Sequence, residues 1–204
     1  MIRTKILMSA LALAALLYIA PNAAQAVAVG SAAPDFQATD SSGKAQTLSQ
    51  YKGKWVVLEW FNEGCPYVKK HYESDNMQKL QREAAKQGVV WLTVISSAPG
   101  KQGHGTPEQV NAKRAEWKIA SAATLLDPEG KVGRLYEAKT TPHMFLIDPQ
   151  GKVAYMGAID DRPTSDPADI PASKNLVKVA LDAAMAGRPV AAAATVPYGC
   201  SVKY

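Results

Sequence analysis

The chain has 204 residues, of which 47% are hydrophobic and 20% are charged, and its net charge is +5. The Lys and Arg residues are dispersed along the chain, so the charge indicates neither a nucleic acid nor a membrane surface as a partner. The sequence contains no internal repeat. The length and the hydrophobic fraction are sufficient for one domain with a substantial core.

The first 26 residues have the three parts of a secretory signal peptide. Arg3 and Lys5 form a short basic start, an apolar run of fifteen residues follows, and Ala24-Gln25-Ala26 supplies the small-x-small pattern. We expect cleavage after Ala26, which lowers the net charge from +5 to +3, and export to a bacterial periplasm. The alternative is an uncleaved membrane anchor, but the run is shorter than the roughly 20 residues that a span needs.

The first half of the mature chain alternates apolar runs with helical patterns. Residues 55–61 and 89–96 are β-rich apolar runs that suit strands buried on both faces of a sheet. Between them, Pro66 and Gly88 mark the start and the end of one expected helix. The other expected elements are a hairpin-like segment at 30–54 with its turn at Ser42-Gly43, and a helix from Thr106 to about Lys118.

The second half is expected to complete the sheet and to end in a tail. Its expected elements are a strand at 123–127, a short helix at 130–138, a hairpin at 143–159 and an amphipathic helix at 173–187. The order β-α-β-α followed by α-β-β-α predicts an α/β domain with a mixed sheet flanked by helices over residues 27–188. Residues 189–204 have no clear periodicity and are expected to form an extended tail.

The two cysteines, Cys65 and Cys200, lie 135 positions apart. Cys65 directly precedes Pro66, so we expect it at a helix N-terminus. There the unpaired N–H groups and the helix dipole favour the thiolate, which is the reactive form of cysteine. We therefore interpret Cys65 as a nucleophile; the alternatives are an inert buried cysteine or one half of a structural disulfide.

Four features follow one another along the mature chain: APDF near its start, the run YKGKWVVLEWF, a cysteine at a strand–helix junction, and Thr141-Pro142 before HMFLID. Together they resemble the peroxiredoxin-like (AhpC/TSA, redoxin) branch of the thioredoxin-fold superfamily. The resemblance covers nearly the whole mature chain and implies a thioredoxin-like fold. It also implies a cis peptide bond at Pro142, beside Cys65.

The chain departs from the family pattern at the reactive centre. Val68 stands where thioredoxins carry their second cysteine, and Leu58 and Asn62 stand where typical peroxiredoxins carry Pro and Thr. The Thr141-Pro142 pair replaces the arginine with which peroxiredoxins orient a peroxide. Fast peroxide chemistry therefore does not follow from the resemblance alone.

An acid, Glu59, interrupts the apolar run six residues before Cys65. In a strand buried on both faces an unpaired carboxylate is costly, or becomes neutral. Because thioredoxins carry an acid at this spacing, the resemblance implies a buried proton acceptor for thiol exchange. The alternative is a side chain that reaches solvent or pairs with a lysine.

Three further residues, Asn62, Thr141 and His143, are candidates for substrate binding. The Asn62 amide could bind a peroxide or sulfenate oxygen, or could cap its own loop. His143 follows the proline and could tune partner docking or thiol acidity, or could be an ordinary strand residue. His71 would allow a copper site with the nearby cysteine, but we expect an exposed helix residue there, and no metal or cofactor.

The tail cysteine is the expected partner of Cys65. Pro197, Gly199 and Ser201 flank Cys200 and indicate a flexible segment that can bring its thiol to Cys65. Cys200 could then resolve a sulfenic acid or a mixed disulfide formed on Cys65. A permanent structural disulfide, or a disulfide to a second subunit, is the alternative.

These features favour a periplasmic, peroxiredoxin-like thiol oxidoreductase that reduces peroxides through Cys65 and resolves through Cys200. A thioredoxin-like or membrane-bound dithiol donor would reduce it again. The alternative is a TlpA-like thiol:disulfide oxidoreductase that acts on protein disulfides, which Pro142 and Glu59 favour and the missing Cys-x-x-Cys disfavours. A redox-responsive or copper-binding protein is a third hypothesis.

Overall fold

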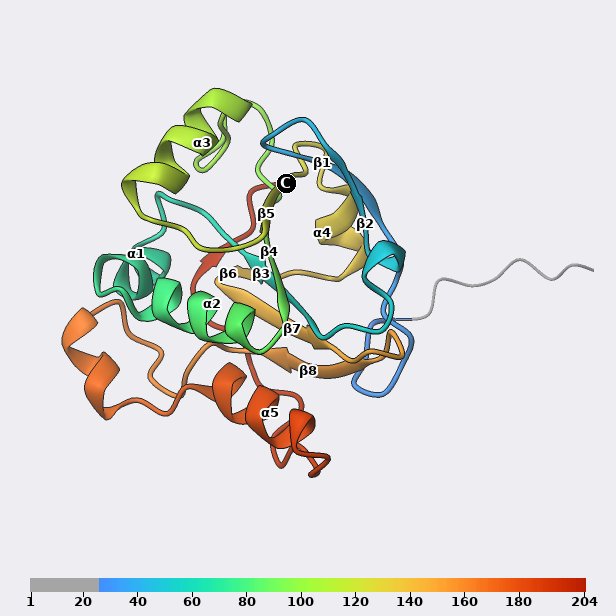
Figure 1. Cartoon of the computed structure of the whole chain (residues 1–204). Helices are drawn as coiled ribbons and strands as arrows, with labels where there is room; N and C mark the ends of the chain where they lie inside the picture. Colours follow the sequence, from blue (N-terminus) through green and yellow to red (C-terminus); the bar gives the residue numbers. More distant parts are fainter. Residues whose placement is uncertain (1–25) are drawn as a thin grey trace, which may run out of the picture.

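The computed structural model describes residues 26–204, so the expected signal peptide lies outside the described residues except for its last residue. The described part contains a seven-stranded sheet in the order β2-β1-β5-β4-β3-β7-β8 (Figure 1). No helix in this part is both long enough and apolar enough to cross a membrane. The strands are β1 (Gln37–Asp40), β2 (Ala45–Thr47), β3 (Val56–Trp60), β4 (Val90–Ile95), β5 (Ala123–Leu126), β7 (His143–Ile147) and β8 (Val153–Gly157).

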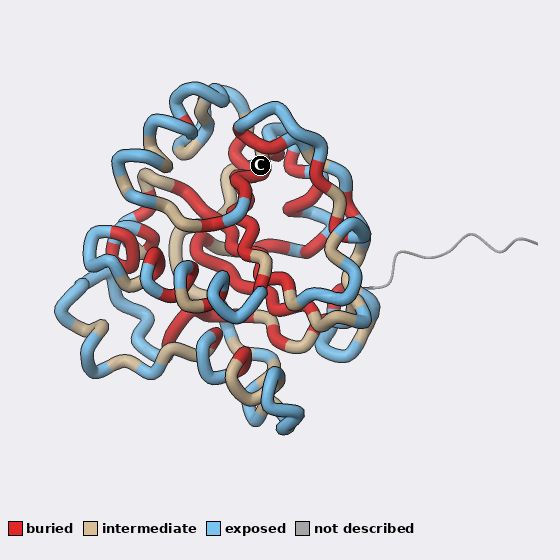
Figure 2. Tube along the Cα trace, viewed as in Figure 1, coloured by how far each residue is buried: buried red, intermediate tan, exposed pale blue. Residues whose placement is uncertain are grey.

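Helices cover both faces of the sheet. Apolar residues of α1, α2 and α5 pack on one face, and those of α4 and of the N-terminal segment pack on the other. Buried residues follow the central strands, and exposed residues lie on the outer sides of the helices (Figure 2). The helices are α1 (Pro66–Glu73), α2 (Asn76–Lys86), α3 (Pro107–Glu116), α4 (Lys131–Leu135) and α5 (Leu176–Met185), with 3₁₀ helices η1 (Ser49–Tyr51) and η2 (Pro167–Ala172).

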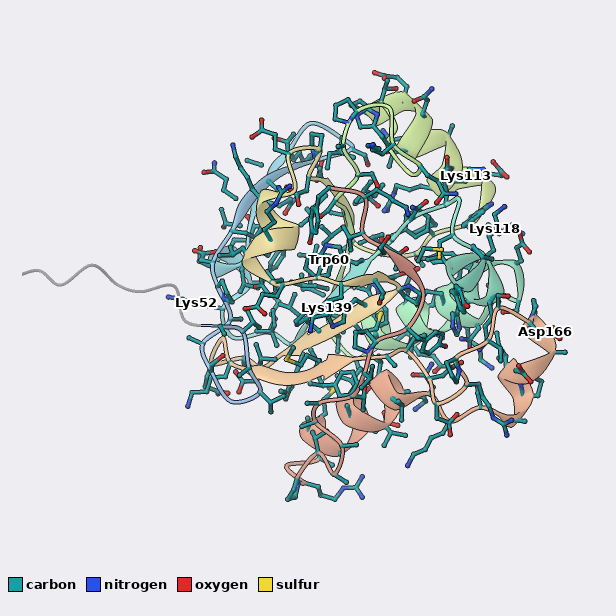
Figure 3. All side chains as sticks on the ribbon, turned by 180° about the vertical axis from the view of Figure 1, so that it is seen from behind. Lys52, Trp60, Lys113, Lys118, Lys139 and Asp166 are labelled. Atoms are coloured by element: carbon teal, nitrogen blue, oxygen red, sulfur yellow. The ribbon has the colours of Figure 1, made fainter. Side chains whose placement is uncertain are left out.

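The central strand β3 confirms the predicted mixed sheet. It pairs parallel with β4 and antiparallel with β7, and every residue of β3 and β7 is buried. The apolar runs VVLEW and HMFLI supply this burial on both faces. Figure 3 shows Trp60 of β3 in the interior, whereas Lys52 and Asp166 lie at the periphery.

The segment after Pro66 differs from the prediction of one helix, because the structure contains two, α1 and α2. Between them Asp75 has a left-handed conformation with a φ of 58°. Ser74 Oγ donates a hydrogen bond of 2.7 Å to the Lys70 carbonyl and so satisfies one acceptor at the end of α1. The local signal for this break is the run Ser74-Asp75-Asn76, because Ser, Asp and Asn are typical of turns.

The tail, residues 189–204, is extended as predicted, but it is held against the domain rather than flexible. Its strand β9 (Cys200–Ser201) pairs antiparallel with β6 (Thr140–Thr141). At the end of the chain, Tyr204 Oη donates a hydrogen bond of 2.9 Å to the Ala138 carbonyl. Figure 1 shows this segment, in red, beside β6 near the centre of the molecule.

Two glycines make room for the tail where it comes closest to the domain. Gly199 has a φ of 134°, and a Cβ at this position would overlap the Thr141 carbonyl oxygen. Gly157 has a φ of 142°, and a Cβ there would overlap the backbone and hydroxyl of Thr195. Glycine is therefore required at both positions for the observed packing.

Candidate active site

Cys65 lies at the N-terminus of α1, directly after β3, as the sequence predicts. It is the N-cap residue, with a φ of −82° and a ψ of 122°, and Pro66 is the first helical residue. Its carbonyl accepts hydrogen bonds of 3.0 Å from the N–H groups of Val68 and Lys69. The residue is fully buried, with 0% of its surface exposed.

The tail brings Cys200 to Cys65, so the two predicted thiols share one site. In the β6–β9 pair Cys200 lies opposite Thr141, and the Cys65 thiol donates a hydrogen bond of 3.1 Å to the Thr141 carbonyl. The two cysteine side chains are also close enough for each to shift the pKa of the other. Both are free thiols, Cys65 buried and Cys200 partly buried. The site is therefore a dithiol whose second member comes from the tail.

The two thiols differ in acidity. Burial raises the pKa of Cys65, but the polar groups around the thiol, which are the side chains of Cys200 and Thr141 and the backbone N–H groups of Cys200 and Val68, outweigh burial, and the pKa is lowered. Burial, together with the hydrogen bond and charge of Cys65, raises the pKa of Cys200 to about 11. Cys65 is therefore the more acidic thiol of the pair, and Cys200 is the less acidic one.

Thr141 contacts both cysteines of this dithiol, and Pro142 follows it in the chain. The peptide bond between them is cis, which confirms the expectation from the resemblance. Thr141 Oγ1 is buried and has no hydrogen-bond partner among residues 26–204, and its position next to Cys65 helps to lower the pKa of that thiol. Thr141 thus contributes its carbonyl, its strand pairing and its hydroxyl to the site.

Glu59 is fully buried in β3, in the same layer as Cys65. Its carboxylate accepts hydrogen bonds of 2.7 Å from Tyr72 Oη, 2.7 Å from Trp91 Nε1 and 3.0 Å from Gln81 Nε2. Burial outweighs these three hydrogen bonds and raises the pKa of Glu59 to about 7. Within the described residues the carboxylate neither reaches solvent nor pairs with a lysine, so that alternative is wrong.

Asn62 stabilises the loop that precedes Cys65. Its Oδ1 accepts a hydrogen bond of 2.9 Å from the Gly64 N–H, and its Nδ2 donates one of 3.2 Å to the Gln102 carbonyl. The side chain therefore connects this loop to the loop after β4. The observed contacts are those of the loop-capping alternative.

His143 lies on the sheet face opposite to Cys65. Its ring contacts that of Phe145, with centroids 4.5 Å apart, and Nδ1 accepts a hydrogen bond of 3.3 Å from the Lys139 N–H. Burial lowers the pKa of His143 to about 3, so the imidazole is neutral. The structure does not bring this residue to the dithiol.

A buried charged cluster anchors the tail next to the dithiol, and no motif in the sequence points to it. Lys70 and Asp160 form an ion pair with 3.1 Å between Nζ and Oδ2, and both are buried. Tyr198, two residues before Cys200, donates its hydroxyl to the other oxygen of Asp160. We call Lys70, Asp160 and Tyr198 the tail latch. The Tyr198 ring also contacts the ring of Tyr67, with centroids 5.8 Å apart.

His71 is fully buried beside this latch, which corrects the prediction of an exposed helix residue. Its Nδ1 accepts a hydrogen bond of 2.8 Å from Asn76 Nδ2, and its Nε2 lies 3.8 Å from Asp160 Oδ2. Burial lowers the pKa of His71 to about 4. Among residues 26–204, no three His, Cys, Asp or Glu side chains are arranged to hold a metal ion.

The fold and the dithiol together define a thiol-based redox protein with a thioredoxin-like α/β fold. Residues 29–156, more than half of the chain, match the model of the AhpC/TSA family. The chain belongs to this family.

Individual relatives agree with this assignment. The thiol-disulfide oxidoreductase ResA of Geobacillus kaustophilus (strain HTA426) is 35% identical over 122 residues, which are 60% of this chain and 64% of the relative. The chain therefore spans just under two thirds of the length of this curated relative. The probable glutathione peroxidase 8-A of Xenopus laevis is 30% identical over 77 residues, which are 38% of this chain and 36% of the relative.

The likeness to solved structures covers most of the chain. An uncharacterized conserved protein of Geobacillus kaustophilus has a TM-score of 0.74 to this chain and is 26% identical. The match covers 87% of this chain and 92% of that protein.

Proposed function

We propose that the protein is a thiol–disulfide oxidoreductase whose redox pair is Cys65 and Cys200. The observation that carries this proposal is the pair of neighbouring thiols that β9 assembles at Thr141, directly before Pro142. The similarity to a thiol-disulfide oxidoreductase, ResA, supports it. The chain has no Cys-x-x-Cys motif, and in our proposal the tail supplies the missing thiol.

The reaction exchanges one disulfide bond for another. A thiolate of the pair attacks a substrate disulfide and forms a mixed disulfide, and the first substrate sulfur leaves as a thiolate. The second cysteine then attacks, the Cys65–Cys200 bond forms, and the second substrate thiolate leaves. Two electrons pass from the protein to the substrate. We assign to Glu59, with its pKa of about 7, the uptake of the proton that Cys200 loses.

The cellular setting of this reaction follows from the expected signal peptide. We infer that the mature chain works in a bacterial periplasm and there meets disulfide substrates. A thioredoxin-like or membrane-bound dithiol donor returns it to the reduced state.

The test is the rate at which dithiothreitol reduces the disulfides of insulin with the mature protein as catalyst. We expect acceleration by the wild type, and background rates with Cys65→Ser and with Cys200→Ser. Thermal unfolding of each variant checks that it is folded. Wild-type turnover by a folded variant that lacks either cysteine would show that the pair is not the redox unit.

Peroxide reduction is a second candidate, favoured by the complete burial of Cys65, which a molecule as small as hydrogen peroxide penetrates more easily than a protein does. The similarity to a probable glutathione peroxidase supports it. The test is the intact mass of the reduced protein after one equivalent of hydrogen peroxide. Peroxidase chemistry predicts a rapid loss of two hydrogens in the wild type and a sulfenic acid in Cys200→Ser. Two thiols that stay reduced would exclude it.

A further inference from the structure

A cavity of about 320 Å³ lies between α3 and the sheet. The residues that line it include Phe61, which directly follows β3, and Ile95, the last residue of β4. Because β3 and β4 are parallel, the cavity lies at the carboxyl ends of two neighbouring strands. Open α/β sheets commonly bind their ligands at this edge. No step of the proposed exchange reaction uses this cavity.

Helix α3 covers the cavity without filling it. Of its ten residues only Val110 is buried, and the helix lies at the periphery of the molecule (Figure 1). Val110 lines the cavity together with the apolar side chains of Phe61, Ile95 and Ile119. The volume lies near the lower end of the range of roughly 300–1,000 Å³ that is typical of small-molecule sites. The cavity therefore suits a small ligand with an apolar part, which would displace water from these side chains.

One positive charge in the wall of the cavity has no carboxylate partner. Arg114 Nη1 donates hydrogen bonds to Ser121 Oγ, over 2.8 Å, and to Thr124 Oγ1, and Nη2 donates one of 2.8 Å to the Ser121 carbonyl. These acceptors are neutral, and Arg114 forms no ion pair within residues 26–204. The Asp40 carboxylate acts on this charge only from a longer distance. A half-buried guanidinium without a close counter-ion favours an anionic ligand.

The carboxylates that line the cavity are already paired with a different cation. Glu63 and Glu116 both form ion pairs with Lys113, over 3.7 Å and 2.8 Å. Their side chains are 44% and 61% exposed, so solvent screens their charges. The charge of Arg114 therefore remains available for a ligand.

The hydrogen bonds of Arg114 also leave donors for a carboxylate. A guanidinium has five N–H groups, and the bonds to Ser121 and Thr124 use both of those on Nη1 and one on Nη2. Within the described residues, the N–H of Nε and the second N–H of Nη2 thus have no partner. Two such neighbouring N–H groups match the two oxygens of a carboxylate.

We propose that this cavity binds a small amphipathic carboxylate, with its apolar chain against Phe61, Ile95 and Val110 and its carboxylate on Arg114. A medium-chain fatty acid has this chemistry. The site uses neither cysteine, so this inference goes beyond the proposed redox function and can fail without affecting it.

The test is a titration of the reduced mature protein with sodium octanoate, followed by two-dimensional NMR of the backbone amides. We expect saturable shifts that are largest at residues 61–63, 95, 103–105 and 107–116. Octanamide, which has the same chain without the charge, should bind about tenfold more weakly. Acetate, which has the charge without the chain, should not reach saturation. Equal affinities for octanoate and octanamide, or the largest shifts outside these residues, would overturn the inference.

A matched pair of variants tests the role of the guanidinium. Arg114→Gln should weaken octanoate binding about tenfold and leave octanamide binding unchanged. Arg82→Gln, at a partly exposed arginine of α2 outside the cavity, should change neither affinity. Thermal unfolding checks that both variants are folded, and the two ligands compared on the wild type decide the question if Arg114→Gln is not. Wild-type affinity for octanoate in a folded Arg114→Gln would contradict the assignment of the carboxylate to Arg114.

Discussion

Cys65 and Cys200 arrive at one site from two regions of different construction. Cys65 stands between a five-residue strand paired on both sides and an eight-residue helix, and its position follows from regular hydrogen bonding and a continuous apolar core. Cys200 stands in a two-residue strand paired on one side and is positioned by a latch, a glycine and a terminal tyrosine. Many weak contacts place the first cysteine, and a few specific ones place the second. Single substitutions should therefore affect the two regions differently.

The largest effect is expected at Glu59, the one ionisable side chain of β3. Its pKa is 4.5 in the unfolded chain and about 7 in the folded protein. Between these pH values the folded protein binds more protons, so the Glu59 contribution to stability is complete below pH 4.5 and is lost as the pH rises to 7. The loss amounts to about 3 kcal/mol. Urea unfolding of Glu59→Gln, compared with the wild type at pH 4.5 and pH 8, measures it.

Two histidines also change the stability of the fold with pH. The Glu59 contribution is therefore measured as the difference in stability between the wild type and Glu59→Gln. The pKa values of His71 and His143 are lowered to about 4 and about 3, so both destabilise the fold as the pH falls below 6.5, which is the opposite sign. Subtracting the variant from the wild type removes these contributions. Glu73→Gln, at an exposed position at the end of α1, is the control and should give a flat difference. A flat difference for Glu59→Gln as well would contradict the raised pKa.

The next effect is expected at Gly199, where the tail passes the Thr141 carbonyl. The methyl group of Gly199→Ala would overlap that oxygen and push Cys200 away. We expect a loss of about 1–3 kcal/mol in stability and a fall of about a hundredfold in the rate at which glutathione disulfide produces the Cys65–Cys200 disulfide. Gly187→Ala is the matched control, because Gly187 also has a positive φ, 67°, but has open space around it. Equal rates in the two variants would show that the close approach is unimportant.

A smaller effect is expected for the tail latch. Tyr198→Phe removes the hydroxyl that binds Asp160 and keeps the ring that packs on Tyr67. We expect a loss of about 1–2 kcal/mol and a reduction potential that is more positive by about 30 mV, because a less restrained Cys200 forms a weaker disulfide. Tyr204→Phe, which removes a bond to a neutral carbonyl at the end of the tail, should change the potential less. If Tyr204→Phe changes the reduction potential more than Tyr198→Phe does, Tyr204 rather than Tyr198 is the main anchor of the tail.

The smallest effect is expected at the outer end of the tail. The Arg134 guanidinium lies over the Tyr204 ring, 4.6 Å from its centroid. Arg134→Gln should lower stability by about 0.5–1 kcal/mol and leave the rate of disulfide formation unchanged. Thermal unfolding and the glutathione assay measure the two quantities. A large change in the rate would show that this contact also positions Cys200.

The contrast between the region around Cys65 and the region around Cys200 also explains which features the sequence predicted. Local periodicity and motifs predicted the strands around β3, the helix that begins after Cys65 and the pairing of β7 with β8. The structure confirms all three. The break at Asp75 had a local signal in the turn residues that surround it. These features depend on residues that are close together in the chain.

The tail and the latch depend on residues that are far apart in the chain. The Lys69-Lys70-His71 cluster has the composition of a solvated helix surface, yet Lys70 and His71 are buried. Their burial is compatible with folding because Asp160 compensates the charge of Lys70, and Asp160 lies 90 residues further along the chain. No local pattern connects these positions. For the same reason the sequence could identify Cys200 as a partner but not the ordered strand that carries it.

The most direct test of a Cys65–Cys200 redox pair is the intact mass and disulfide map of the mature protein after equilibration in glutathione redox buffers. The account predicts one cooperative transition between the reduced protein and a monomer that is lighter by two hydrogens, in which peptides containing Cys65 and Cys200 are linked. Separate glutathione adducts on the two cysteines, or a disulfide between two chains, would contradict it.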